Sequence, residues 1–150
     1  MSGLPIATGG LRHLALRVRD VAAAKAFYCE CFGMHIVWEP DADSVYLSSG
    51  TDNLALHKAA EGRAPAAEQA LDHLGFLVAT PAAVYAAAEA LRARGVPIVH
   101  EARAHRDGSH SCYIADPDGN AVQILYEPNI STSPAMAHHG GTEARRKQSE

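Results

Sequence analysis

The chain has 150 residues, 47% of them hydrophobic, and a formal net charge of −4. This composition is typical of one globular domain with a sizeable core. No Lys/Arg cluster precedes the final segment, so we expect no nucleic-acid partner, because such partners require a basic face. We expect neither a signal peptide nor a membrane partner, since the first ten residues lack a basic start and no apolar run has the length of a membrane span.

The three cysteines indicate a reducing compartment. Their number is odd, and Cys29 and Cys31 lie two residues apart on an expected helix, so they point in different directions. We therefore predict free thiols that pack as small hydrophobic side chains in a cytoplasmic protein.

An internal repeat is the most informative feature of the sequence. The segment LRHLALRV at residues 11–18 returns as LDHLGFLV at residues 71–78. In both copies apolar residues alternate with others, a period of two that predicts a strand. Leu14, Leu16 and Val18 are expected to share one face, and His13 the opposite one.

Each repeated strand precedes a segment with helix start and stop signals. Asp20 can cap a helix that begins at Val21, and Gly33 suits its left-handed end. In the second copy Thr80 is the expected cap, with Pro81 at the first helical position, and Gly95 ends the helix. The apolar stripes of both helices would cover the leucine-rich faces of the strands.

Three short strands are expected after each helix, which predicts two βαβββ modules at residues 11–57 and 71–127. The first three strands are expected at 35–39, 44–48 and 53–57, and the second three at 98–101, 111–115 and 121–127. We expect a single domain over residues 1–128, with residues 58–70 as a linker. Residues 129–150 are predicted to be a polar, disordered tail in which His138 and His139 are solvated.

Four linked motifs resemble the vicinal-oxygen-chelate superfamily of glyoxalases, bleomycin-resistance proteins and extradiol dioxygenases. They are LRHLALRVRD, AKAFYCECFGM, LDHLGFLVAT and YIADPDGNAVQIL, within residues 11–127. The resemblance implies an α+β fold in which two βαβββ modules form a curved mixed sheet around a cavity, with the helices outside. It also implies a divalent metal held by a histidine on the first strand and a residue on the last strand of each module.

Two histidines match the family's ligand positions. His13 and His73 occupy equivalent places in the repeat and are expected to face the cavity. A pair of neutral imidazoles there suits zinc, nickel or ferrous iron. A histidine on a sheet face can instead simply pack or form a hydrogen bond, but the repetition favours the ligand role.

The last strands depart from the family pattern. The carboxylate expected in metalloenzyme members falls on Gln123, and its counterpart in the first module falls near Ala55. His57 lies one pleat beyond Ala55, about 6.7 Å along an ideal strand, and is the expected additional ligand and a catalytic candidate. Glu127, about 13 Å beyond Gln123 along the strand, is interpreted as a surface charge at the end of the strand.

Four further residues are candidates for the chemistry. Tyr113 matches a tyrosine that acts as an acid in extradiol enzymes and is the second catalytic candidate. The predicted substrate-binding residues are Arg17, Tyr46 and His110. Packing of the aromatic rings and simple surface exposure of Arg17 are the alternatives.

The sequence leaves two main functions open. The first is a metal-dependent lyase, isomerase or transferase of the glyoxalase type that acts on a small oxygenated molecule. The second is a metal-free binding protein that sequesters a small molecule, as bleomycin-resistance proteins do. A set without carboxylates disfavours an ordinary extradiol dioxygenase, and a purely structural role would leave the polar cavity residues unexplained. A homodimer is expected, because the 58–70 linker is long enough for modules to be exchanged between subunits and twofold dimers are the commonest oligomers.

Overall fold

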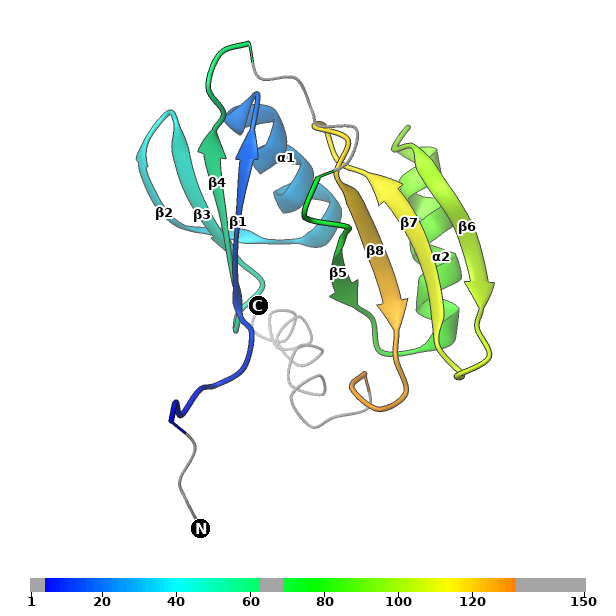
Figure 1. Cartoon of the computed structure of the whole chain (residues 1–150). Coiled ribbons are helices and arrows are strands. Elements are labelled where there is room, and N and C mark those ends of the chain that lie inside the picture. Colours follow the sequence, from blue (N-terminus) through cyan, green and yellow to red (C-terminus); the bar gives the residue numbers. More distant parts are fainter. Residues whose placement is uncertain (1–4, 63–68, 132–150) are drawn as a thin grey trace, which may run out of the picture. The chain divides into compact units, whose positions relative to one another are not determined.

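The computed structural model describes residues 5–62 and 69–131. The chain divides into two compact units, residues 1–66 and 67–150, and each contains one βαβββ module (Figure 1). The first comprises β1 (His13–Val18), α1 (Val21–Phe32), β2 (His35–Asp41), β3 (Ser44–Ser48) and β4 (Asn53–Lys58). The second comprises β5 (Leu74–Leu77), α2 (Pro81–Ala93), β6 (Ile98–Ala104), β7 (His110–Ala115) and β8 (Ala121–Tyr126). The predicted α+β class and the two βαβββ modules are confirmed.

The two sheets have the same topology. Their strand orders are β1-β4-β3-β2 and β5-β8-β7-β6. The first and last strands of each module pair in parallel, and the other neighbours pair antiparallel. The module helix therefore forms the crossover between its first strand and the rest of its sheet.

The helices begin where the sequence predicts. The Asp20 carboxylate accepts a hydrogen bond from the Ala23 amide at 3.0 Å, and Gly33 takes the left-handed conformation with φ 65° at the end of α1. Thr80 caps α2 through the Ala83 amide at 3.2 Å. The last helical residue of α2 is Ala93, and the left-handed turn follows at Gly95, where φ is 78°.

Each module has its own apolar core between helix and sheet. In the first module Val18, Val45, Leu47 and Leu56 are fully buried, as is Tyr28 of α1. In the second module, Val84 of α2 and the sheet residues Cys112, Ile114 and Val122 are fully buried. Alternation along each strand thus sorts apolar residues to the helix-covered face and leaves the other face, here called the open face, for polar side chains.

Several element boundaries differ from the sequence-based expectation. The strand β5 begins only at Leu74, so His73 immediately precedes it. The strands β2 and β6 continue to Asp41 and Ala104. Both are edge strands with register shifts against their partners, and such bulges let pairing continue into the hairpin turn.

The segment after β8 is ordered at its start. The Glu127 carboxylate accepts hydrogen bonds from the backbone and side-chain nitrogens of Asn129, both at 2.9 Å, and Ser131 is buried. Glu127 therefore stabilises a turn at the end of the strand. The remainder of the predicted tail, with His138 and His139, and the middle of the predicted linker lie outside the described residues.

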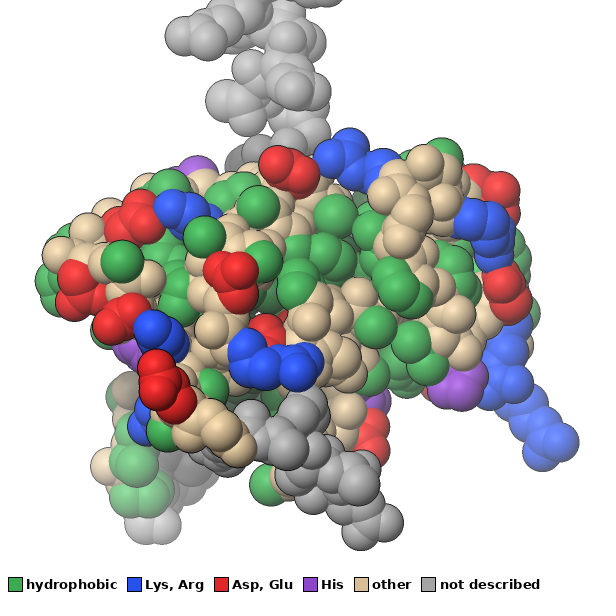
Figure 2. All heavy atoms as spheres, turned by 90° about the horizontal axis from the view of Figure 1, so that it is seen from above, with side chains coloured by type: hydrophobic (Ala, Val, Ile, Leu, Met, Phe, Trp, Pro, Cys, Tyr) green, Lys and Arg blue, Asp and Glu red, His purple; other side chains and the backbone are tan. Residues whose placement is uncertain are grey.

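Charged side chains of both signs are interspersed on the face shown in Figure 2. Among the described residues, local ion pairs include that of Lys25 with Glu39 at 2.7 Å. Neither helix in the described part of the chain has the length and apolar character that crossing a membrane requires.

Candidate functional site

The strand registers place equivalent residues of the two modules in matching rows on the open faces. One row in the first module is Ala15, Ala55, Tyr46 and Trp38. Its counterpart in the second module is Gly75, Gln123, Tyr113 and His100. Ala55 and Gln123 are thus equivalent positions, in agreement with the count from the sequence.

His13 lies at the start of β1 beside the last strand of its module. Its Nδ1 lies 2.7 Å from Oδ1 of Asn53, the residue directly opposite it in the parallel pair. With Nδ1–H donating to this oxygen, Nε2 keeps its lone pair. An outer hydrogen bond of this kind is what fixes the tautomer and ring orientation of histidine ligands.

His73 has the same arrangement with a different partner. Its Nδ1 lies 2.5 Å from Oδ1 of Asp72. A carboxylate can only accept, so Nδ1 carries the proton and Nε2 is again the free nitrogen. The edge of the ring meets Tyr113, with centroids 5.2 Å apart and an interplanar angle of 84°. The His73 side chain is 35% exposed, so it is accessible.

The register separates His57 from His13. His57 pairs with Arg17, four residues beyond His13 on β1, a displacement of about 13 Å along an ideal strand. Within their module these imidazoles therefore do not meet at one point as expected. The reason is that β1 and β4 pair in parallel, which sets Asn53 rather than His57 beside His13.

His57 instead lines an open recess with a volume of about 710 Å³. Arg17 and Lys58 line the same recess. The Nδ1 of His57 lies 3.0 Å from the Ser44 hydroxyl, and its ring packs edge-on against Tyr46. The predicted substrate-binding Arg17 and the predicted catalytic His57 are thus brought together, but not with His13.

Gln123 lies over a glycine of the neighbouring strand. A Cβ at Gly75 would lie 3.6 Å from the Gln123 amide oxygen. The side chain of Gln123 thus extends across Gly75 on the open face. It offers a neutral amide oxygen, and the equivalent Ala55 offers no polar side-chain atom.

Tyr113 occupies the centre of the open face of the second module. Its ring packs edge-on against His73 and also against His100, with centroids 5.4 Å apart in the second pair. Burial, followed by the negative charge of Asp72, raises the pKa of Tyr113, while Arg103 opposes the rise. Tyr113 is therefore a protonated hydrogen-bond donor at neutral pH.

A second recess adjoins Tyr113 and has a volume of about 320 Å³. Its other lining residues include Asp72, His100, Glu101, Arg103 and Ser111. Sequence reasoning missed His100 and Arg103, because strict alternation places residues three apart on opposite faces. A register shift in β6 between these two residues turns both toward the recess.

His110 lies on the other face of the sheet. Its Nδ1 is 3.1 Å from the Tyr85 hydroxyl of α2, so it lies on the helix-covered face, away from Tyr113. The buried neighbours Cys112 and Ile114 have the same strand parity, and this signal was available in the sequence. Tyr46, in contrast, lies on the open face and packs against Trp38.

The described residues within either module contain no group of three or more His, Cys, Asp or Glu side chains placed to hold a metal ion. Each module offers one histidine whose Nδ1 faces a carboxamide or carboxylate oxygen, His13 and His73, whereas Nδ1 of His57 and of His110 faces a hydroxyl group. This donor set is neutral, because Gln123 and Ala55 stand where a carboxylate would add charge.

The fold defines a protein of two βαβββ modules, in each of which a helix covers one face of the sheet. The model of the Glyoxalase/Bleomycin resistance protein/Dioxygenase superfamily matches residues 10–124. The chain belongs to this superfamily.

Solved structures and a curated protein are similar to the chain. A lactoylglutathione lyase from Agrobacterium tumefaciens is 26% identical with a TM-score of 0.65, covering 79% of this chain and 94% of that one. A glyoxalase-related enzyme from Fulvimarina pelagi is 25% identical with a TM-score of 0.66, covering 81% and 90%. Biphenyl-2,3-diol 1,2-dioxygenase from Sphingomonas paucimobilis is 30% identical over 132 residues and 85% of this chain. The chain spans 42% of that protein's length.

Proposed function

We propose that the protein is a metal-dependent glyoxalase-like enzyme, a lyase, isomerase or transferase that acts on a small oxygenated molecule. In this proposal His13 and His73 hold a divalent cation, zinc, nickel or iron, with Gln123 as a weaker ligand. The observation that carries it is the repeated outer hydrogen bond. Both imidazoles have Nδ1 beside an oxygen that only accepts, from Asn53 or Asp72, and Nε2 left free, as ligand histidines do.

A bound divalent cation would polarise the paired oxygens of a substrate. The other predicted site residues have separate tasks in this proposal. Tyr113 donates a hydrogen bond or a proton, since its raised pKa keeps the phenol protonated. His57 is proposed as a base, and Arg17 in the same recess binds an anionic part of the substrate. Tyr46 forms an apolar wall beside them.

The reaction in the name of the curated dioxygenase is not proposed for this chain. Non-haem iron oxygen chemistry typically uses two histidines and one carboxylate. Gln123 occupies the position of that carboxylate and adds no charge. We therefore favour chemistry that polarises a carbonyl over oxygen activation.

The test is a metal-affinity measurement. Native protein, His13→Ala, His73→Ala and His110→Ala are titrated with zinc against a chromophoric chelator. The proposal expects a large loss of affinity for the first two variants and none for His110→Ala, which is the matched control on the helix-covered face. Native affinity in His73→Ala would refute the metal site.

Metal-free binding of a small molecule is the second candidate function. It is favoured by Ala55 and Gln123, the two positions without a carboxylate, and by the recess of about 320 Å³ in the second module. Under this alternative the native protein carries no stoichiometric metal after purification without chelator. Elemental analysis of such a preparation distinguishes the two.

We also propose a cytoplasmic homodimer. The compartment is supported by Cys29, Cys31 and Cys112, which are free thiols. Association is supported by β2, an edge strand on which Ile36, Val37 and Trp38 are 47%, 57% and 59% exposed. Exposed apolar side chains grouped in this way are typical of interaction surfaces. A monomer mass from light scattering at micromolar concentration would refute the dimer.

A further inference from the structure

We propose that the recess beside Tyr113 selects small molecules that carry a carboxylate, and that Arg103 is the residue that recognises it. The inference assigns a substrate class to the proposed function, on which it rests for the reaction. Binding of the carboxylate itself does not require a metal.

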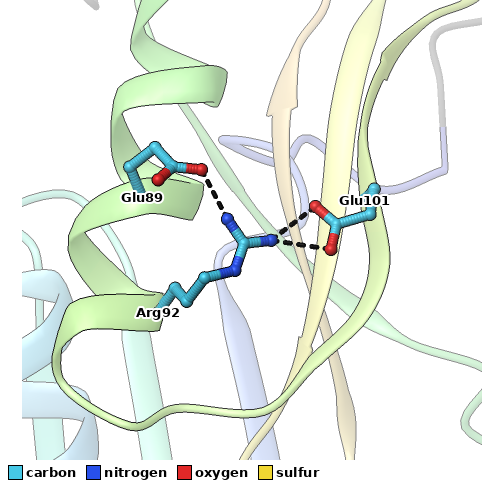
Figure 3. Close-up of polar contacts among 3 residues, drawn as sticks. All are labelled: Glu89, Arg92 and Glu101. Carbon is cyan, nitrogen blue, oxygen red and sulfur yellow. Dashed lines mark hydrogen bonds and ion pairs between the residues drawn. The ribbon is translucent and has the colours of Figure 1, made fainter.

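Two carboxylates line the recess beside Arg103, and each has a hydrogen-bond donor within its own module. Arg92 pairs with Glu101, with its Nη2 2.6 Å from both Glu101 oxygens, and shares its single charge with Glu89 (Figure 3). Asp72 is engaged by Nδ1 of His73 at 2.5 Å. With Nε2 of His73 free, the imidazole is neutral and Asp72 keeps its negative charge. Recognition of an anion in the recess therefore depends on the guanidinium of Arg103.

Arg103 is the cation that remains. Arg103 lines the recess, and its guanidinium forms no hydrogen bond or ion pair with the described residues. A guanidinium presents parallel N–H groups that match the two oxygens of a carboxylate.

The recess also has the size and the polar groups for a small ligand. A volume of about 320 Å³ falls at the lower end of the range for small-molecule sites. Tyr113 and His100 come from the same row as Gln123, so a ligand anchored by Arg103 would present its other end to Gln123 and His73, the proposed metal ligands of the same module. We infer a compact substrate with a carboxylate at one end and oxygens at the other.

The test compares two probes that differ by one carboxylate, catechol and 3,4-dihydroxybenzoate. Binding to the native protein and to Arg103→Gln, Arg103→Lys and Arg106→Gln is measured by NMR titration. Arg106 is the matched control, since it lies in the β6–β7 turn and does not line the recess. Circular dichroism melting checks that each variant is folded.

The proposal expects 3,4-dihydroxybenzoate to bind at least about tenfold more tightly than catechol, since hydrogen bonds to charged groups contribute at this level. Arg103→Gln should abolish the difference, Arg103→Lys should keep part of it, and Arg106→Gln should keep all of it. Equal affinities in the native protein, no binding of either probe, or an unchanged preference in Arg103→Gln would each overturn it.

A further titration tests carboxylate recognition by Arg103 separately from the proposed metal site. The same titration is made with His73→Ala. A preference that persists there after the metal affinity is lost supports carboxylate recognition by Arg103 independently of the metal. Loss of the preference in Arg103→Gln with unchanged zinc affinity supports the same assignment.

Discussion

Asp72 offers a direct test of how the second module holds its histidine. Its carboxylate accepts a hydrogen bond from Nδ1–H of His73, with 2.5 Å between Nδ1 and Oδ1. The Nε2 atom of His73 is left free. Removing such an outer partner typically lowers metal affinity by about 10–100-fold. Because the Asp72 side chain is 94% exposed, water can replace part of the interaction, and we expect about 10-fold for Asp72→Ala, the lower end of that range.

Two further variants separate geometry from charge. Asp72→Asn keeps an acceptor oxygen beside His73 and removes only the charge, so we expect a smaller loss than for Asp72→Ala. Glu89→Gln removes the same charge from α2, where Glu89 pairs with Arg92, and should leave metal affinity unchanged. The reasoning is refuted if Asp72→Ala binds zinc as the native protein does while His73→Ala does not bind.

Three other predictions concern the same open face. Gln123→Glu should tighten zinc binding by at least about tenfold, since a full charge replaces a dipole beside the cation; weaker binding in a competition titration would remove Gln123 from the ligand set. The pKa of Tyr113, raised mainly by burial, should rise further in Arg103→Gln, as measured by NMR of labelled tyrosine. A lowered Tyr113 pKa in Arg103→Gln would contradict the opposing effect of Arg103. Because the folded-state pKa of Tyr113 is raised, the stability that the protonated phenol contributes is complete below the ordinary tyrosine pKa. It is lost as the pH rises through the folded-state value. Gly75→Ala should stabilise the fold by about 0.5–1 kcal/mol, because the new Cβ would meet Gln123 at ordinary contact distances of 3.6–3.7 Å; a lower midpoint in denaturant unfolding would show that the space is tighter than this.

Most of the fold could be predicted from the sequence because its signals are local. The caps at Asp20 and Thr80 act on amides three residues away, and alternation along a strand sorts side chains within that strand. The repeat around His13 and His73 then indicates the same module twice. The parity of His110 with Cys112 and Ile114 is a signal of the same local kind, and it indicates the helix-covered face.

What only the tertiary structure decided is how the strands are paired. The parallel register sets Asn53 beside His13 and Arg17 beside His57. His13 and His57, which were expected to converge on one metal, are therefore separated along the strands. The register shift in β6 brings Arg103 to the same recess as His100. Register depends on hydrogen bonds between segments distant in sequence, whereas periodicity within one strand specifies only which face each residue shares.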